Sequence, residues 1–382
     1  MNDIYFDNSA TTPLRREVIG VMTRVMETEY GNPSSLHSKG VEAERILKEA
    51  RENILRAMKI RQSQNAEIIF CGSGTEANNL AVFGTVRAKN KKSKRIITTD
   101  SEHPSILEPL NVLESEGAEV IRLSTRGGVI DMEELKSAVT PDTMLVSVML
   151  VNNETGALYD VKTAFSIVKK INPATVTHCD AVQGFGKIQF SPHDYGIDLM
   201  SVSAHKLHGP KGIGALYCNR SVITSRRLIP HIYGGGQEIG LRSGTQNTVA
   251  VAGFGEAVKY CMDLNGVTSL RDYFVEQLPP EITVNTPHGG FAPYIVSITL
   301  PGIKSETMLH FLSAKGIYVS SGSACSSNTG HISYTLVNFG LDKQAADCTL
   351  RISFNENNTK EQIDILTEEL KHGLDTLIRI RK

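Results

Sequence analysis

The 382-residue sequence lacks an excess of charge of either sign and lacks any long apolar run. Forty Lys and Arg residues against forty-one Asp and Glu residues leave a formal net charge of -1, which gives no electrostatic basis for binding nucleic acid or a membrane surface. No apolar run reaches the roughly 18 residues that a membrane-spanning helix needs, and residues 1–4 lack the basic and apolar regions of a signal peptide. We therefore expect a cytoplasmic protein without a nucleic-acid-binding domain or a membrane span.

Paired cysteines are also missing. Six cysteines are scattered without a single C-x-x-C pair, which argues against a disulfide framework and against a zinc ribbon, so no metal site is expected. Most of the cysteines should be reduced core residues. Cys325 differs, because it lies in a run of small and polar residues, 320–328, that cannot pack as a core. Since exposed thiols are usually selected against, this context favours a reactive role for Cys325.

The sequence does contain a regular alternation of short apolar segments and helical segments. Strands are predicted at 67–70, 95–99, 119–123, 144–151, 176–180 and 199–203, with helices between most of them. This alternation predicts an α/β fold with a mostly parallel central sheet and helices on both faces. Beyond residue 265 the pattern changes to that of a smaller α+β domain. We expect a large domain of residues 14–262 and a small domain of residues 1–13 and 263–382, which carries the Cys325 segment.

A glycine-rich turn follows the first of these strands. Residues 72–77 read Gly-Ser-Gly-Thr-Glu-Ala, and Asp100 follows the next strand. This pattern matches the G-x-G-x-x-A fingerprint of a dinucleotide site. It also suits any phosphate group, because glycines allow close backbone approach and the free N–H groups of a helix N-terminus attract an anion. The pattern alone does not separate these interpretations from an ordinary tight turn.

Polar residues recur where the predicted strands end. His103 follows one strand, Asn153 a second, Asp180 and Gln183 a third, and Lys206 a fourth. Any one of them has an ordinary explanation as a helix cap, a turn former or a solvated side chain. In a mostly parallel sheet, however, the carboxyl ends of the strands meet at one edge, where α/β proteins bind ligands. Together they therefore favour one shared crevice.

A pyridine cofactor with a phosphate tail would need such a set of residues. It requires a lysine for its aldehyde, a carboxylate beside the ring nitrogen, a flat partner for the ring and a cup for the phosphate. Lys206, Asp180, His103 and the turn at 72–75 fill these roles, whereas a nicotinamide enzyme needs neither this lysine nor this carboxylate. The segment 233–245 could close the phosphate cup or form a surface loop. Arg351 could bind a carboxylate or form a structural salt bridge.

The order of these motifs along nearly the whole chain resembles the cysteine desulfurases of the NifS/IscS type. These are pyridoxal-phosphate enzymes of fold type I, related to the class V aminotransferases. The segments that carry the resemblance are residues 7–13, 31–35, 72–79, 102–105, 152–156, 180–183, 203–212, 242–245, 322–325 and 351–354. The chain departs from the usual pattern at Cys71, His208 and residues 328–331, none of which removes a catalytic group.

The resemblance implies a role for each matching residue. The implied catalytic residues are Lys206, Cys325 and His103, with Lys206 holding the cofactor and moving the substrate's Cα proton. The cofactor would also contact Gly74, Thr75, Asp180, Gln183, Ser203 and His205, together with Thr245 from the partner subunit of a homodimer. Asn153, Arg351 and Asn32 would bind the substrate.

The implied reaction converts L-cysteine to L-alanine and leaves the sulfur as a persulfide on Cys325. A sulfur acceptor or scaffold protein is the implied partner, and the Ser-Gly-Ser-Ala-Cys form of residues 321–325 resembles the group associated with iron–sulfur clusters. The alternatives are a selenocysteine lyase or another class V lyase or aminotransferase, a nicotinamide-dependent oxidoreductase, and a non-catalytic scaffold or sulfur carrier. A plain aminotransferase has no use for Cys325, and a scaffold would have no need of Lys206, Asp180 and His103.

Overall fold

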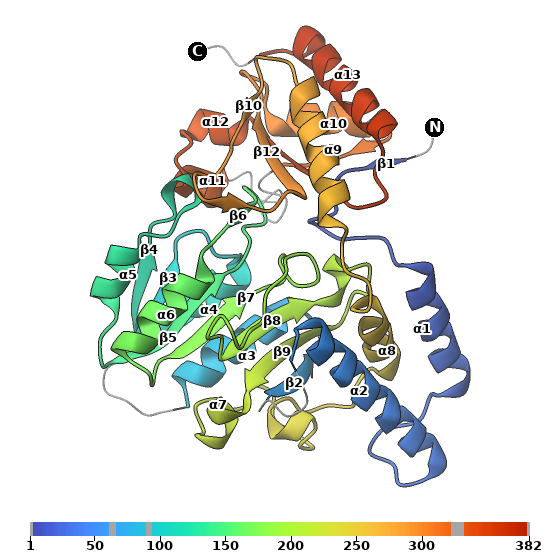
Figure 1. Ribbon diagram of the computed structural model, residues 1–382, viewed down its shortest axis with the longest axis vertical. Coiled ribbons are helices and arrows are strands. Elements are labelled where there is room, and N and C mark those ends of the chain that lie inside the picture. Colours follow the sequence, from blue (N-terminus) through green and yellow to red (C-terminus); the bar gives the residue numbers. More distant parts are fainter. Residues whose placement is uncertain (1–2, 61–65, 89–93, 322–331, 380–382) are drawn as a thin grey trace.

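The computed structural model describes residues 3–60, 66–88, 94–321 and 332–379, and its largest element is a seven-stranded sheet (Figure 1). The strand order is β2-β9-β8-β7-β5-β3-β4. The bounds are β2 (Ala66–Cys71), β3 (Arg95–Thr99), β4 (Glu119–Leu123), β5 (Thr143–Met149), β7 (Val176–Asp180), β8 (Leu199–Ser203) and β9 (Gly214–Asn219). Only β9 runs antiparallel to its neighbours, β2 and β8. The predicted mostly parallel sheet is confirmed, although β9 was not predicted.

Both faces of this sheet are covered, because side chains alternate along each strand. Ile68 and Phe70 of β2 pack on one face with α2 (Ser38–Ala57), α6 (Val161–Ile171) and α8 (Thr248–Ala257). Ile69 and Cys71 of the same strand pack on the other face with α3 (Gly74–Val86) and α4 (Pro104–Ser115). The sequence predicts this helix at residues 77–88, but α3 begins three residues earlier because the side chain of Ser73 caps it by accepting a hydrogen bond from the amide of Glu76.

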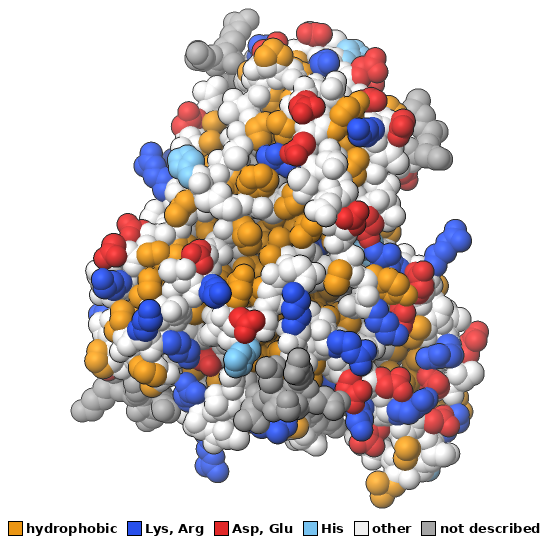
Figure 2. Space-filling view, viewed as in Figure 1, with side chains coloured by type: hydrophobic (Ala, Val, Ile, Leu, Met, Phe, Trp, Pro, Cys, Tyr) orange, Lys and Arg blue, Asp and Glu red, His pale blue; other side chains and the backbone are white. Residues whose placement is uncertain are grey.

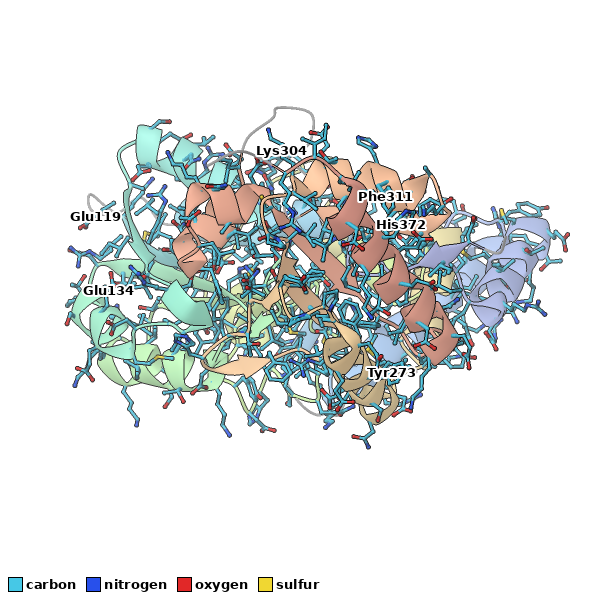
Figure 3. The ribbon with its side chains drawn as sticks, turned by 90° about the horizontal axis from the view of Figure 1, so that it is seen from above. Glu119, Glu134, Tyr273, Lys304, Phe311 and His372 are labelled. Atoms are coloured by element: carbon cyan, nitrogen blue, oxygen red, sulfur yellow. The ribbon has the colours of Figure 1, made fainter. Side chains whose placement is uncertain are left out.

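The C-terminal residues build a second, four-stranded antiparallel sheet of order β10-β12-β15-β14, which lies above the large sheet in Figure 1. Its strands are β10 (Thr283–Val284), β12 (Ile295–Thr299), β14 (Ser320–Ser321) and β15 (Thr349–Ser353). Helices α9 (Leu264–Gln277), α10 (Ser305–Ser313) and α13 (Lys360–Thr376) pack together beside it. Tyr273 Oη donates to Asp364 at 2.6 Å, and the rings of Phe311 and His372 meet edge to face on the same surface (Figure 3).

The N-terminal segment joins this C-terminal sheet. Strand β1 (Ile4–Tyr5) pairs in parallel with β13 (Ile317–Tyr318), and Asp7 bridges to Ser353 on β15. This pairing is compatible with the expected grouping of residues 1–13 and 263–382, whose boundaries stay a prediction. Figure 2 shows hydrophobic side chains gathered across the middle of one face, where the C-terminal elements meet the larger part.

Shorter elements complete the described chain. They are α1 (Arg16–Thr28), α5 (Met132–Ala138), α7 (Arg220–Thr224), α11 (Tyr334–Phe339), α12 (Lys343–Asp347), β6 (Ala157–Leu158), β11 (Gly290–Phe291) and 3₁₀ turns at Arg126–Gly128, Ala204–Lys206 and Glu238–Gly240. Within the described ranges, no helix has both the length and the apolar character needed to cross a membrane.

Candidate active site

A cavity of about 450 Å³ opens at the carboxyl ends of the large sheet, between that sheet and the C-terminal part. Ten of the residues expected from the sequence line it: Lys206, His103, Gly74, Thr75, Asp180, Gln183, Ser203, His205, Asn153 and Arg351. They come from the ends of five elements of the sheet and from β15. The expected convergence of strand ends is therefore seen in the structure, although the roles of the individual residues stay predictions.

Lys206 lies in the 3₁₀ turn that follows β8, and the N-terminal segment holds its amine. Nζ donates to the backbone oxygens of Ser9 and Ala10, both at 2.7 Å. Thr12 Oγ1 also donates to the carbonyl of His205 at 2.9 Å and accepts from the amide of His208 at 2.7 Å. His208 has a φ of +60°, a conformation that the surrounding bonds maintain at this turn. The N-terminal segment thus fixes the lysine in the cavity wall.

A hydrogen-bonded chain connects Asp180 to His103. Asn78 Nδ2 donates to Asp180 Oδ2 at 2.7 Å and to Ser105 Oγ at 2.8 Å, while Asp180 Oδ1 accepts from the amide of Val182 at 3.0 Å. Ser105 Oγ lies 2.8 Å from Nδ1 of His103. Because all of these groups are buried or half-buried, the chain holds the carboxylate and the imidazole in fixed orientations on the cavity wall.

The same contacts determine which nitrogen of His103 carries a proton. The backbone amide of Ser105 donates to Nδ1 of His103 at 3.1 Å, and since an amide can only donate, the neutral ring carries its proton on Nε2. Burial lowers the pKa of His103, and the positive charge of Lys206 lowers it further, against the opposing effect of Asp180. His103 is therefore a neutral imidazole at physiological pH, able to donate a proton from Nε2.

The turn between β2 and α3 forms one end of the cavity. A Cβ atom at Gly74 would come within 2.9 Å of Val182 Cγ2 and 3.3 Å of Ser203 Cβ, so glycine is needed for this close approach. Ser203 at the end of β8 lies against Gly74, and His205 in the next turn lines the same cavity. Burial together with the charge of Lys206 lowers the pKa of His205 to about 4. Hydroxyl groups, a neutral imidazole and a helix N-terminus together suit an anionic group such as a phosphate.

Asp100, which motivated the dinucleotide interpretation, has a different role. Its Oδ1 accepts from the amide of Thr125 at 3.1 Å and from the hydroxyl of Thr125 at 2.6 Å, so this carboxylate holds the loop after β4. Asp100 is not among the residues that line the cavity. The acidic partner that a ribose would need beside the glycine turn is therefore not provided by Asp100.

Of the two roles that the sequence left open for Arg351, the structure shows the salt bridge. Its Nη2 forms an ion pair with Asp7 at 2.7 Å and its Nη1 donates to the carbonyl of Asn153 at 2.8 Å. The side chain is 5% exposed, and Nε is buried without a hydrogen-bond partner in the described structure. Arg351 is thus part of a structural salt bridge and also lines the cavity, and its binding of a substrate carboxylate stays a prediction.

Two carboxyl groups beside the site were expected from the sequence only as polar residues at strand ends, without an assigned role. Glu102 is fully buried, and burial raises its pKa to about 8, while the amide of Met149 and the hydroxyl of Thr99 oppose the shift by donating to Oε1. Glu154 lines the cavity, and burial raises its pKa to about 7. In the sequence, Glu102 is only a polar residue next to His103, and Glu154 is only a polar residue next to Asn153. A sequence does not indicate that such side chains are buried so deeply.

The raised pKa of Glu102 predicts a stability effect of Glu102→Gln. Between about pH 4.5 and 8 the folded state keeps a proton on Glu102 that the unfolded state has released, so this group's contribution to stability is lost as the pH rises through that window. Glutamine does not titrate. We expect the free energy of unfolding of Glu102→Gln, relative to the wild type, to increase by about 2–4 kcal/mol from pH 5 to pH 8.

Denaturant unfolding at both pH values measures this difference, and Glu108→Gln is the control. Glu108 lies on α4 in an exposed position, so its replacement should leave the pH dependence unchanged. A constant difference between Glu102→Gln and the wild type across this range would contradict the expected protonation of Glu102.

The remaining three expected residues do not line this cavity. Thr245 and Asn32 are exposed, and their neighbours Gln246, Pro33 and Ser34 line a second cavity of about 420 Å³ together with residues 235–237. The two segments therefore lie side by side. Cys325 lies outside the described residues.

Comparison with known proteins agrees with this architecture. Residues 4–366 match the family model described as aminotransferase class-V. The chain is 36% identical over 387 residues to a protein named cysteine desulfurase IscS from Dictyoglomus turgidum, covering 99% of this chain and 94% of that protein. A solved structure titled NifS-like protein matches with a TM-score of 0.90 and 35% identity over 98% of this chain and 100% of that chain. Another, titled SspA in complex with cysteine, matches with a TM-score of 0.82 and 30% identity over 93% and 100% of the two chains.

The fold and the family match show that the chain belongs to the class-V aminotransferase family. Within that family, its similarity along nearly the full length identifies it as a member of the cysteine desulfurases of the NifS/IscS type.

Proposed function

We propose that this protein is a pyridoxal-phosphate-dependent enzyme that converts L-cysteine to L-alanine and transfers the sulfur to Cys325. The observation that carries the proposal is the meeting of Lys206, Asp180 and His103 in one cavity, with a glycine turn at its end. These groups match the needs of a pyridine ring with an aldehyde and a phosphate. Two buried oxygens beside them, Asn78 Oδ1 and Ser9 Oγ, have no hydrogen-bond partner in the described structure, which further supports the fit of a polar ligand.

When bound, pyridoxal phosphate supplies an aldehyde for amino groups and a protonated ring that accepts electron density from the substrate's α-carbon. The residues of this chain would do the rest. Ser203, His205 and the N-terminus of α3 bind the phosphate, and Asp180 keeps the ring nitrogen protonated. Lys206 moves the proton at the substrate's Cα, and Arg351 binds the substrate carboxylate.

Sulfur transfer requires a nucleophile, which we assign to Cys325. The Cys325 thiolate attacks the sulfur of the bound cysteine; a sulfur–sulfur bond forms while the bond between that sulfur and the substrate's Cβ breaks. The electron pair of the broken bond stays with the carbon skeleton, which takes up a proton and leaves as alanine. The persulfide on Cys325 then passes its outer sulfur to an acceptor thiol or scaffold protein, for iron–sulfur cluster or other thio-cofactor synthesis.

We also propose a homodimer in which the Thr245 and Asn32 segments serve the cavity of the second copy. The two segments adjoin each other beside the second cavity, and neither Thr245 nor Asn32 lines the active-site cavity of its own chain. Large apolar side chains on the same segments are exposed: Leu36 is 99% exposed, Tyr233 75% and Ile239 59%. Apolar groups exposed to this extent support burial against another protein surface.

The function is tested by incubating the protein with L-cysteine and a reducing thiol and measuring the products. We expect alanine and sulfide in equal amounts, and we expect Cys325→Ser to lower both by about 10²-fold, since an activated thiolate is the attacking group. Cys261→Ser is the control, because Cys261 is an exposed thiol on another segment. Pyruvate in place of alanine, or equal rates in the wild type and Cys325→Ser, would favour another class V lyase or aminotransferase. Comparing L-selenocysteine with L-cysteine tests the selenocysteine lyase alternative.

A further inference from the structure

A second lysine, Lys187, lies buried directly behind the cavity wall. It follows β7 and is 4% exposed. Its Nζ lies 3.4 Å from Oε1 of Gln183 and 4.7 Å from the centre of the Tyr294 ring. Within the described ranges, Nζ of Lys187 forms no ion pair with a carboxylate. A buried amine without such a counterion reduces stability, so a role in the site would explain the presence of this lysine better than packing alone.

The contacts around Gln183 show what the amine of Lys187 does. Gln183 Nε2 donates to the carbonyl of Ser9 at 2.9 Å, and the backbone oxygen of Gln183 accepts from the hydroxyl of Tyr294 at 2.8 Å. A carbonyl can only accept and a protonated lysine can only donate, so Ser9 and Lys187 together fix which end of the side-chain amide is nitrogen. One N–H bond of Nε2 remains after the bond to Ser9, and Gln183 lines the cavity.

The charges facing Lys187 make its own protonation sensitive to pH. Burial lowers the pKa of Lys187 to about 7, and the charges of Lys206 and Arg351 lower it further, while Glu356 raises it. Lys187 is therefore more fully protonated at pH 6 than at pH 8.5. As the pH rises, a smaller fraction of Lys187 carries the extra proton, so both hydrogen-bond donation to Gln183 and the positive charge at this wall of the cavity decrease.

We propose that Lys187 is a positioning residue of the active site, which orients the amide of Gln183 toward the cofactor and adds a positive charge behind it. The ligand group that this arrangement suits is an anionic ring oxygen, which accepts from Nε2 of Gln183 and is stabilised by the nearby positive charge. This inference rests on the proposed function, because it takes pyridoxal phosphate as the group that occupies the cavity.

The test compares Lys187→Met with the wild type and with a matched control, Lys162→Met. Lys162 also lies over a tyrosine ring, with Nζ 6.0 Å from the centre of Tyr195, but it is exposed and is not among the residues that line the cavity. Affinity of the apoprotein for pyridoxal phosphate is measured at pH 6 and pH 8.5. We expect Lys187→Met to bind about 5- to 10-fold more weakly at pH 6, with a smaller difference at pH 8.5, and Lys162→Met to match the wild type.

Two further measurements separate positioning from packing. Because the charge of Lys187 favours the anionic form of a nearby group, Lys187→Met should raise the pKa at which the absorbance of the bound cofactor changes. In the double variant Lys187→Met, Gln183→Leu, the loss in affinity should be smaller than the sum of the two single losses, since both replacements remove the same interaction. The melting temperature of each apoprotein checks that the variants fold.

The outcomes distinguish this inference from the proposed function. If the wild type does not bind pyridoxal phosphate, the proposed function fails. If the wild type binds it but Lys187→Met keeps the same affinity at both pH values and the same absorbance titration, Lys187 is not a positioning residue. Strictly additive losses in the double variant would likewise exclude action through Gln183.

Discussion

Replacing Lys206 with alanine is expected to lower the rate of alanine formation from L-cysteine by at least about 10⁴-fold. In the proposed function, Lys206 supplies both the amine that holds the cofactor and the base that moves the substrate's Cα proton, and the replacement removes both. It also removes the donor that binds the carbonyls of Ser9 and Ala10 at 2.7 Å, although Ser9 keeps its hydrogen bond from Gln183 Nε2. The absorption band of the lysine-bound cofactor should disappear from the purified protein, while the phosphate-binding turn at the start of α3 is left intact.

Two variants make this experiment specific. Lys206→Arg keeps a cation beside Ser9 and Ala10 but carries a group that does not lose its proton in this pH range, so we expect it to be as inactive as the alanine variant while retaining its melting temperature. Lys211→Ala changes an exposed lysine of the same turn and should behave as the wild type does. Substantial turnover by Lys206→Arg would contradict the assignment of Lys206 as the base.

The sequence predicted the site well for residues that lie at the end of a strand or just after it. Asp180 ends a strand whose apolar character was evident, and five further residues come after such strands; all six line the cavity, the five being His103, Asn153, Gln183, His205 and Lys206. The parallel topology brings such strand ends to one edge whatever the details of packing. The start of α3 was misplaced by three residues, since the capping contact of Ser73 depends on local geometry that composition does not reveal.

Residues that act through tertiary contacts could not be predicted in this way. Asn78 lies on α3 among apolar neighbours, and its link between Asp180 and Ser105 depends on how α3 packs on the sheet. Lys187 has the sequence context of an ordinary surface lysine, and only its packing against Tyr294, 107 residues later in the chain, buries it. The antiparallel strand β9 was missed because its glycine-rich approach resembles a loop. A Cβ at Gly214 would meet the backbone of Ser73 and Gly74 within 2.5–2.7 Å, a constraint that appears only in the folded sheet.

Asp180 and Glu102 are two buried carboxyl groups, and we expect their replacement by the corresponding amides to affect catalysis differently. Glu102 carries a proton at neutral pH, because burial raises its pKa to about 8. Replacing it with glutamine therefore removes no charge, and Glu102→Gln should retain most of its activity at pH 7. Asp180 accepts hydrogen bonds at both oxygens, from the side chain of Asn78 and from the amide of Val182. These two donors fix the orientation of the Asp180 carboxyl group in the cavity wall.

Asp180→Asn should therefore lower kcat by about 10³-fold, because an amide cannot hold the ring nitrogen of the cofactor in its protonated form. The variant also places an N–H group beside Nδ2 of Asn78, which already donates to Ser105 at 2.8 Å. Asn78 could then offer its buried, unpartnered Oδ1 only by turning its amide, and that would break the bond to Ser105 and loosen His103.

Measurement of cofactor binding and turnover in the same preparation separates these effects. Lys206 and the phosphate-binding turn are unchanged in Asp180→Asn, so the variant should still bind pyridoxal phosphate, with an altered absorbance and a low kcat. Glu102→Gln is the matched control for the loss of a buried carboxyl group on this side of the sheet. If the two variants lose activity equally, the negative charge of Asp180 is not what the reaction requires, and the hydrogen-bonded chain through Asn78 would have to account for both losses.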